Sequence, residues 1–248
     1  MISTTPITLR NLTVAYRGHP AVHHLSGEFE AGSLTAVVGP NGAGKTSLLA
    51  AIMGGLQPTE GEVHLAADLR RQIAWLPQQA TIDRSFPACV FDLVALGHWG
   101  SVGSFRALSA AHSEQVLDAL QAVGLGGFER RSIGELSAGQ FQRVLFARVL
   151  LQDAPVILLD EPFNAIDART TADLLAVVSR WHAEARTVIA VLHDLEQVRE
   201  HFDQTLLLAR RCVAWGPTAE VLQAANLFRA RQMAEGWKDN APVCQELA

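Results

Sequence analysis

A glycine-rich segment at residues 39–46 follows a short apolar run at residues 34–38 and precedes a helix-forming stretch at residues 45–53. Its glycines let the backbone turn tightly and direct N–H groups at phosphates, while Lys45 can reach the terminal phosphates and Thr46 can ligate Mg²⁺. The apolar run is typical of a buried parallel strand, and the helix would place its positive N-terminus at the phosphates. The segment alone predicts a nucleoside triphosphate site; a purely structural glycine turn is the alternative. It reads Gly39, Pro40, Asn41, Gly42, Ala43, Gly44, Lys45 and Thr46.

Composition narrows the class of protein. The chain has 248 residues, of which 49% are apolar, enough for a sizeable core in one α/β domain or in a core with an inserted lobe. A net charge of -5 without a basic tract argues against a nucleic-acid partner. Runs of about 18 apolar residues are absent, and so is a basic segment followed by an apolar one at the start, so we expect neither a bilayer span nor export. Cys89, Cys212 and Cys244 are scattered, which favours free thiols in a reducing cytosol.

Patterning along the chain predicts three regions. Alternating residues near the N-terminus indicate a small β layer, and helical segments broken by glycines between about residues 80 and 135 indicate an inserted helical lobe. Helices and apolar strands then alternate, which implies a parallel sheet. The expected strands are residues 7–9, 12–14, 21–29, 34–38, 156–159 and 187–192, and the expected helices are residues 45–53, 89–96, 113–123, 139–151 and 168–185.

Two carboxylates end the apolar strand at residues 156–159. Parallel α/β sheets bind their ligands at the carboxyl ends of strands, so Asp160 is expected in the Mg²⁺ shell. Glu161 would point the other way and polarise the water that attacks the γ-phosphate. The alternative is a pair that merely ends a buried strand, but carboxylates in such a position carry a desolvation cost.

A second anion site is predicted at the start of another helix. Ser137 is a plausible N-cap, and the free N–H groups behind it combine with the helix dipole. Most such caps only begin a helix. A second phosphate site becomes useful if two subunits share each nucleotide. The segment reads Leu136, Ser137, Ala138, Gly139 and Gln140.

Together these motifs resemble those of the ATP-binding subunit of an ABC transporter, with residues 39–46 similar to the Walker A loop, 136–140 to the signature motif and 156–161 to the Walker B strand. The likeness spans roughly residues 7–225. It implies an α/β fold of the P-loop NTPase (RecA-like) type, with a parallel-sheet core, an N-terminal antiparallel β layer and an inserted α-helical lobe. Residues 1–248 would form a single ABC ATPase domain. Its parts would be a nucleotide-binding core (1–79 and 136–225), a helical subdomain (80–135) and a C-terminal tail (226–248).

The resemblance also implies roles for residues that would be ordinary on their own. Tyr16 would stack on adenine, Gln78 would sense Mg²⁺ and the attacking water, and His193 would contact the γ-phosphate. The catalytic set would be Lys45, Gln78, Glu161 and His193, and the Mg²⁺ ligands Thr46, Gln78 and Asp160. The residues expected to bind ATP and its Mg²⁺ are Tyr16, Gly39, Pro40, Asn41, Gly42, Ala43, Gly44, Lys45, Thr46, Ser47, Gln78, Ser137, Gly139, Gln140, Asp160, Asp167 and His193.

Two residues depart from the family pattern. Ala138 replaces the usual glycine, and Asn164 replaces the usual serine of the loop that contains Asp167.

The family works as symmetric pairs, which here implies a homodimer in which each signature motif closes over the other subunit's nucleotide. The implied function is ATP hydrolysis on the cytoplasmic face of the inner membrane, bound to integral membrane permease subunits and served indirectly by an extracytoplasmic solute-binding protein.

The likeness of residues 79–87, 161–163 and 190–195 is to subunits that power zinc, manganese or iron importers. The alternatives are another cargo such as an iron chelate, a non-transport nucleotide switch, or a module that holds ATP without hydrolysis. Asp160, Glu161 and His193 weaken the last of these.

Other conspicuous side chains have simpler interpretations. His19, His23 and His24 lack a partnered cluster at ligand spacing, so surface or capping roles are expected. Aromatic residues of the helical lobe are expected mostly in its core; alternatively, one or more line a groove for a helix of the membrane subunit. These aromatic residues are Phe86, Phe91 and Trp99.

Overall fold

The computed structural model describes residues 6–16, 19–66, 69–78, 83–103, 107–164 and 166–236, apart from the side chains of Tyr16, Arg71 and Ser101. Its strands are β1 (Ile7–Tyr16), β2 (His19–Phe29), β3 (Leu34–Val38), β4 (Glu60–His64), β5 (Ile73–Leu76), β6 (Val156–Asp160), β7 (Thr187–Val191), β8 (Gln204–Ala209) and β9 (Arg211–Pro217). Its α-helices are α1 (Lys45–Met53), α2 (Val90–Ala95), α3 (Trp99–Val102), α4 (Ala110–Ala122), α5 (Ala138–Gln152), α6 (Ala168–Ala183), α7 (Leu195–His201), α8 (Thr218–Val221) and α9 (Ala224–Gly236).

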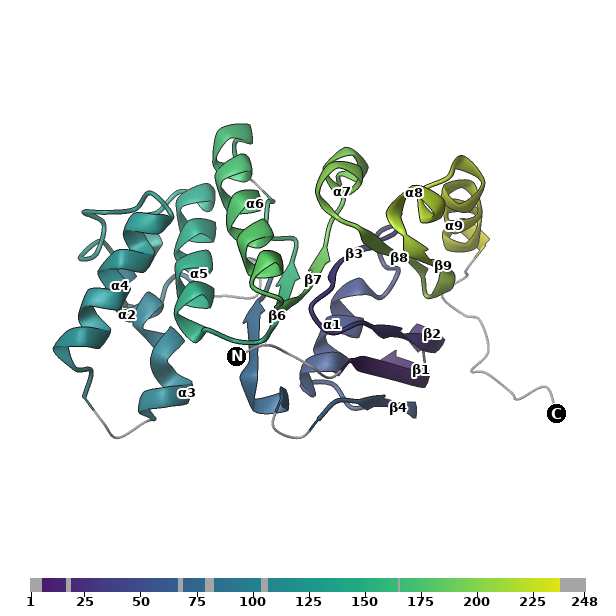
Figure 1. Cartoon of the computed structure of the whole chain (residues 1–248), viewed down its shortest axis with the longest axis horizontal. Helices are drawn as coiled ribbons and strands as arrows, with labels where there is room; N and C mark the ends of the chain where they lie inside the picture. The colour runs from purple at the N-terminus through teal and green to yellow at the C-terminus, as the bar shows by residue number, and fades with distance from the viewer. Residues whose placement is uncertain are drawn as a thin grey trace.

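Two sheets organise the molecule (Figure 1). The larger has the order β5-β6-β7-β3-β8-β9, and its first five strands are parallel, whereas β9 is antiparallel at the edge. The smaller is antiparallel, with the order β2-β1-β4. Helices α2, α3 and α4 gather at one end of the molecule, and α8 and α9 lie at the other. The predicted α/β fold, with its parallel core, β layer and helical insertion, is confirmed.

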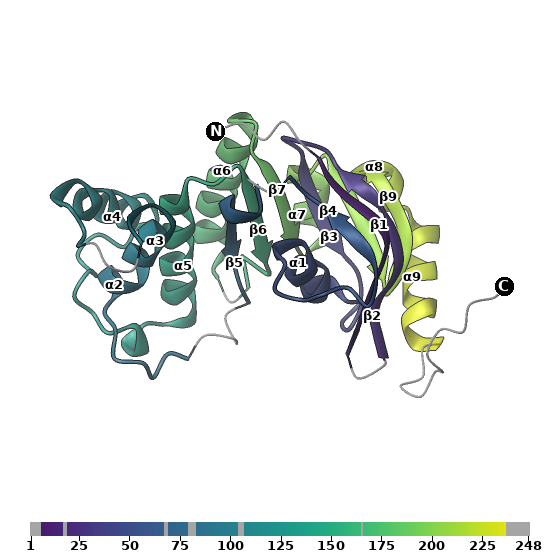
Figure 2. The same ribbon diagram turned by 90° about the horizontal axis from the view of Figure 1, so that it is seen from below.

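The parallel sheet separates two hydrophobic cores because successive side chains of a strand point to opposite faces. In β3, Val37 joins α1 and the antiparallel layer on one face, while Ala36 and Val38 join α5, α6 and α9 on the other. Figure 2 shows α1 between the two sheets. The carboxyl end of β3 is therefore held rigidly from both sides.

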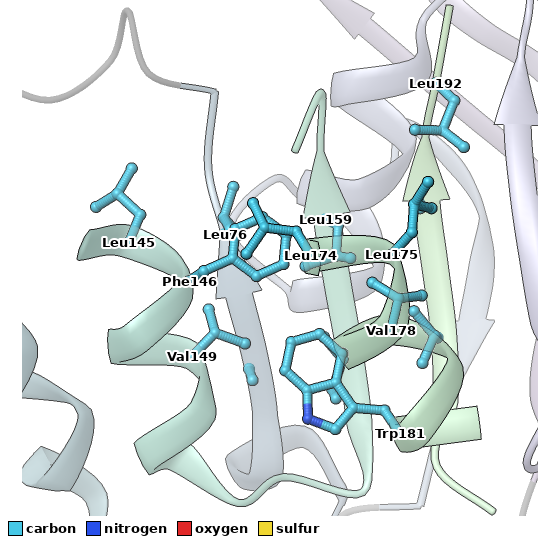
Figure 3. Packing of buried hydrophobic residues seen from close by; sticks show 14 of the residues in the cluster. Leu76, Leu145, Phe146, Val149, Leu159, Leu174, Leu175, Val178, Trp181 and Leu192 are labelled. Carbon is cyan, nitrogen blue, oxygen red and sulfur yellow. The ribbon is translucent and has the colours of Figure 1, made fainter. Parts of the chain in front are cut away.

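Helices α5 and α6 cover the second face with large side chains (Figure 3). The rings of Phe146 in α5 and Trp181 in α6 are nearly parallel, with centroids 6.2 Å apart. Truncating such a buried aromatic residue typically costs about 3–5 kcal/mol. Helix α5 also packs on α2 and α4, so it joins the predicted helical subdomain to the predicted core.

Several local expectations need correction. Phe86 and Trp99 are 65% and 58% exposed, so neither lies in the lobe core; only Phe91 packs partly against it. His23 is buried, where its Nδ1 accepts a hydrogen bond from Arg211, so it has neither a surface nor a capping role. The expected helix 113–123 begins at Ala110, because Ser109 caps it. Within the described ranges, no helix combines the length and apolar character needed to cross a bilayer.

Candidate functional site

Three chain segments leave the parallel sheet at one edge. Val191 of β7 lies opposite Val37 of β3 and opposite Asp160 of β6, so the ends of these three strands are level. The glycine-rich loop, Glu161 and His193 follow these positions within two residues. Sheet register thus brings together residues that lie far apart in the sequence, at the edge where parallel sheets bind ligands.

The glycine-rich loop is confined by neighbouring backbone. Gly44, the N-cap of α1, has φ 92°, and a Cβ there would lie 2.0 Å from the carbonyl oxygen of Ala21 in β2. A Cβ on Gly39 would lie 1.9 Å from the carbonyl oxygen of Leu208 in β8. Both positions therefore need glycine for space as well as for conformation. The antiparallel layer and β8 press the loop into the shape that directs the start of α1 at the sheet edge.

Lys45 lies inside this loop and is 6% exposed. Its Nζ donates hydrogen bonds to the carbonyl oxygens of Gly39 at 2.8 Å and Pro40 at 3.0 Å. Burial lowers the pKa of Lys45, although the nearby carboxylates of Glu161 and Asp160 act in the opposite direction. An ammonium group so placed is a fixed positive charge beside the helix N-terminus, which suits a polyphosphate.

Asp160 is fully buried at the end of β6. Burial raises its pKa, and the hydroxyl of Thr46, in the first turn of α1, is the group that most counteracts this. Among the described residues, neither carboxylate oxygen of Asp160 has a protein partner in full hydrogen-bond geometry. A buried carboxylate with unsatisfied oxygens beside a hydroxyl is the donor set that a hard divalent cation such as Mg²⁺ takes.

Glu161 is the centre of a second cluster. Its Oε1 accepts a hydrogen bond from Nε2 of His193 at 2.6 Å, and its Oε2 accepts bonds from the amides of Gln78 at 2.9 Å and Asn164 at 3.2 Å. Glu161 has a φ of 50°, a left-handed backbone conformation that costs free energy in residues other than glycine. Residues strained in this way recur at active sites. Burial raises the pKa of Glu161, but the hydrogen bond and charge of His193, with Gln78 and Lys45, hold that pKa below its usual value. The carboxylate is therefore ionised at neutral pH, as a proton acceptor must be.

The signature segment is organised around the start of α5. Ser137 Oγ accepts a hydrogen bond from the Gln140 N–H at 3.2 Å, and Gln140 Oε1 accepts one from the Ser137 N–H at 3.0 Å. This is a capping box, so the predicted N-cap has the expected geometry. Gly139 follows within the first turn, where backbone N–H groups lack helical partners.

The structure gathers some predicted residues and leaves others apart. Lys45, Thr46, Gln78, Asp160, Glu161 and His193 form one constellation at the sheet edge. Asp167, by contrast, is exposed and caps α6 by accepting bonds from Thr170. The backbone of Tyr16 ends β1, but its side chain lies outside the described part. The remaining loop residues, Pro40, Asn41, Gly42, Ala43 and Ser47, lie on the loop and the first turn of α1.

Sequence reasoning missed two contributors. Gln142 is 1% exposed in α5, and its Nε2 donates to the carbonyl oxygen of Pro162 at 2.8 Å, which connects the signature helix to the residue after Glu161. The signal in the sequence was a glutamine among apolar helix positions, because a buried polar side chain needs a hydrogen-bond partner. Asn164, judged only as a departure from the family pattern, donates directly to Glu161. That contact depends on the strained turn, which no local pattern predicts.

Comparison with known proteins agrees with this geometry. The family model described as "ABC transporter" matches residues 22–164, more than half of the chain. The chain is 38% identical to the manganese transport system ATP-binding protein of Listeria monocytogenes, covering 86% of this chain and 90% of that protein. It is also 38% identical to the zinc transport system ATP-binding protein of Treponema pallidum, covering 90% and 86% respectively. Among solved structures, a dimeric bacterial ABC transporter cassette superposes with a TM-score of 0.75 at 26% identity, covering 86% of this chain and 98% of that one.

The matched sequence, the parallel-sheet core and the residues gathered at the sheet edge agree with one another. The chain therefore belongs to the ABC transporter family, as an ATP-binding subunit that hydrolyses ATP to drive transport.

Proposed function

We propose that this chain energises the import of manganese or zinc, with Glu161 as the general base of ATP hydrolysis. The observation that carries the catalytic assignment is the position of Glu161, ionised and held by three hydrogen-bond donors at the sheet edge beside Lys45 and Asp160. Support for the cargo comes from relatives that serve manganese and zinc transport systems. The protein would lie on the cytoplasmic face of the inner membrane with permease subunits, served by an extracytoplasmic solute-binding protein and binding no nucleic acid.

In this proposal, the residues of one chain divide the chemistry between them. Lys45 and the N–H groups at the start of α1 balance the charge that develops on the transferred phosphoryl group. His193 orients the Glu161 carboxylate, whose remaining lone pair, on Oε1, accepts the proton of the attacking water. Gln78, bonded to the same carboxylate, positions that water. Thr46, Asp160 and Gln78 would hold Mg²⁺, which would neutralise charge between the β- and γ-phosphates when bound.

We further propose that the working unit is a homodimer. The signature residues Ser137, Gly139 and Gln140 begin α5 in the helical part, whereas Lys45 begins α1 in the core. Among the described residues, the side-chain hydrogen bonds of Ser137 and Gln140 stay within the start of α5, and those of Lys45 stay within the glycine-rich loop. A second copy would bring its signature segment to the nucleotide held by the first. The dimeric form of the related bacterial cassette supports this arrangement.

A surface for the membrane partner is proposed on the helical part. Phe86, Leu96 and Trp99 are 65%, 46% and 58% exposed, which is unusual for large apolar side chains. Leu96 and Trp99, but not Phe86, line a groove of about 290 Å³, whose other lining residues are Asp92, Ala95, His98, Val102, Gly103 and Leu108. Its size and apolar walls suit one turn of a cytoplasmic helix from a permease subunit.

The catalytic assignment is tested with Glu161→Gln in the purified chain. Loss of the base is expected to lower phosphate release about 10²- to 10⁴-fold, while ATP binding persists and the variant accumulates as a dimer in ATP. Glu114→Gln, an exposed change on α4, is the matched control and is expected to leave turnover unchanged. Near-normal phosphate release by the Glu161 variant would contradict the assignment.

The cargo is tested in cells that depend on this chain. Cellular manganese and zinc are measured by mass spectrometry in strains that carry the wild-type chain, the Glu161→Gln variant or no copy. We expect one of the two metals to fall equally in the last two strains and to recover with the wild-type chain. Unchanged manganese and zinc would refute the cargo proposal and leave the ATPase assignment intact.

A further inference from the structure

Two segments of the helical part run antiparallel to each other, one after the loop that carries Gln78 and the other before the signature motif. Ile133 N–H donates to the carbonyl of Ala88 at 3.1 Å, and Val90 N–H donates to the carbonyl of Arg131 at 2.9 Å. A β-bridge lies between these pairs. The ladder fixes the two segments in register and directs the earlier one toward the signature motif.

Beyond the last of these backbone bonds, a side chain continues the connection. Arg84 Nη2 donates to the carbonyl oxygen of Leu136 and reaches the carbonyl of Ile133 at 3.4 Å. Its guanidinium carbon lies 4.9 Å from the centroid of the Phe141 ring. Leu136 directly precedes Ser137, and Phe141 lies one turn after it in α5. One guanidinium therefore contacts the chain on both sides of the signature serine.

Ser137 lies between the two points that Arg84 contacts. The serine is exposed, and its own hydroxyl is committed to the capping box of α5, so its direction follows that of the helix start and of the Leu136 peptide. Arg84 Nε is buried and has no hydrogen-bond partner among the described residues. Within the described ranges, the hydrogen bonds of this guanidinium go to the carbonyl oxygens of Ile133 and Leu136, and a charged donor bonds such oxygens strongly.

Arg84 lies in the chain between a residue of the catalytic cluster and an exposed aromatic residue. Six positions earlier, Gln78 is bonded to Glu161, and two positions later Phe86 is exposed on the surface proposed for the membrane partner. Gln142 of α5 in turn bonds the carbonyl next to Glu161. The signature segment is therefore bonded on one side to Arg84 and, through Gln142 of α5, on the other side to the catalytic edge of the same chain.

We propose that Arg84 is a positioning residue for the signature motif. It holds Ser137 and Gly139 in the orientation that closes over the nucleotide of a second copy. The inference rests on the proposed function, because it presumes the homodimer. It assigns to Arg84 a role in dimer closure and none in nucleotide binding by the single chain.

The test measures ATP-driven dimerisation by analytical ultracentrifugation in the Glu161→Gln background. Adding Arg84→Met, which keeps the length of the side chain but removes its charge and donors, is expected to weaken dimerisation at least about tenfold. Binding of a fluorescent ATP analogue to the monomer should stay within about twofold. Arg84→Lys, which keeps the charge but lacks the planar group over Phe141, should give an intermediate loss. The matched control is Arg131→Met, since Arg131 also stacks on a phenylalanine ring of the helical part, that of Phe128.

The possible outcomes distinguish the role of Arg84 from the homodimer on which it depends. If the Glu161→Gln chain with Arg84 intact stays monomeric in ATP, the dimer proposal fails. If that chain dimerises and the Arg84→Met chain dimerises equally well, only the role of Arg84 is refuted. Should Arg84→Met misfold, Arg84→Lys decides: undiminished dimerisation at an unchanged melting temperature overturns the inference. An equal loss in Arg131→Met would also overturn it, because the effect would then belong to the helical part in general.

Discussion

At the scale of single residues, neighbouring carboxylates at the end of β6 are tuned in opposite directions. Burial raises the pKa of Asp160, whereas His193 and two further partners outweigh burial and lower that of Glu161. A lowered pKa keeps Glu161 charged for proton transfer. A raised pKa means that the ionised form of Asp160 destabilises the folded chain at neutral pH, a cost that a bound cation would offset.

This difference yields a prediction for Asp160→Asn. Removing the buried charge is expected to raise the melting temperature of the nucleotide-free chain at pH 7, by about 2–4 °C for each kcal/mol recovered, while hydrolysis falls sharply. The gain should shrink as the pH falls through the raised pKa, because wild-type Asp160 then becomes neutral too. Calorimetry and phosphate release measure the two effects. Asp173→Asn, at an exposed position of α6, is the control and should change neither; a lower melting temperature in the Asp160 variant would contradict the argument.

At the scale of elements, the first turn of helix α5 is expected to serve two roles. Ser137 caps the helix in the folded monomer and is proposed to contact phosphate across the dimer. The same capping geometry occurs at α4, where Ser109 Oγ accepts from the His112 N–H at 3.2 Å. The two helices therefore allow the cap and the phosphate contact to be separated.

Ser137→Asp is expected to keep the melting temperature within about 1 °C, because aspartate caps helices as well as serine does. The added negative charge should repel the partner's γ-phosphate, so ATP-driven dimerisation and turnover should fall at least about tenfold. Ser109→Asp makes the equivalent change at the other helix and should preserve both stability and turnover. Full activity of the Ser137 variant would show that its hydroxyl serves the cap alone.

At the scale of the whole molecule, exposed aromatic side chains occur on separate elements. Phe86 precedes α2, Trp99 begins α3, and Phe228, 61% exposed, belongs to α9. Figure 1 places α2 and α3 at one end of the molecule and α9 at the other. The isolated chain does not need Phe86 or Trp99 for its core. Their exposure is accounted for by the proposed membrane partner.

The double change Phe86→Ser and Trp99→Ser is expected to leave the melting temperature and basal turnover of the isolated chain unaltered. Affinity for the cognate permease in lipid vesicles should fall at least about tenfold, because aromatic anchors dominate interface energies. Stimulation of turnover by the permease should fall with it. Phe228→Ser is the matched control. An equal loss in that variant would argue against a specific surface at Phe86 and Trp99.

The sequence alone determined the elements that depend on local chemistry. The strand Leu34–Val38 and the helix Lys45–Met53 have the predicted bounds, and Ser137 caps α5 as expected, because glycine, capping and apolar patterns act over a few residues. Asp160 and Glu161 could be placed at a sheet edge for the same reason. Strands β4, β5, β8 and β9 were not predicted, since their stability comes from distant partners.

Only the tertiary structure decided how these pieces meet. The sheet order places β3 between β7 and β8, which carries His193 to the glycine-rich loop and presses Leu208 against Gly39. The burial of His23, the exposure of Trp99 and the reach of Arg84 to Leu136 depend on which segments pack together. Such contacts join residues far apart in the sequence, and each is set by the balance of all surrounding packing, so no local pattern contains them.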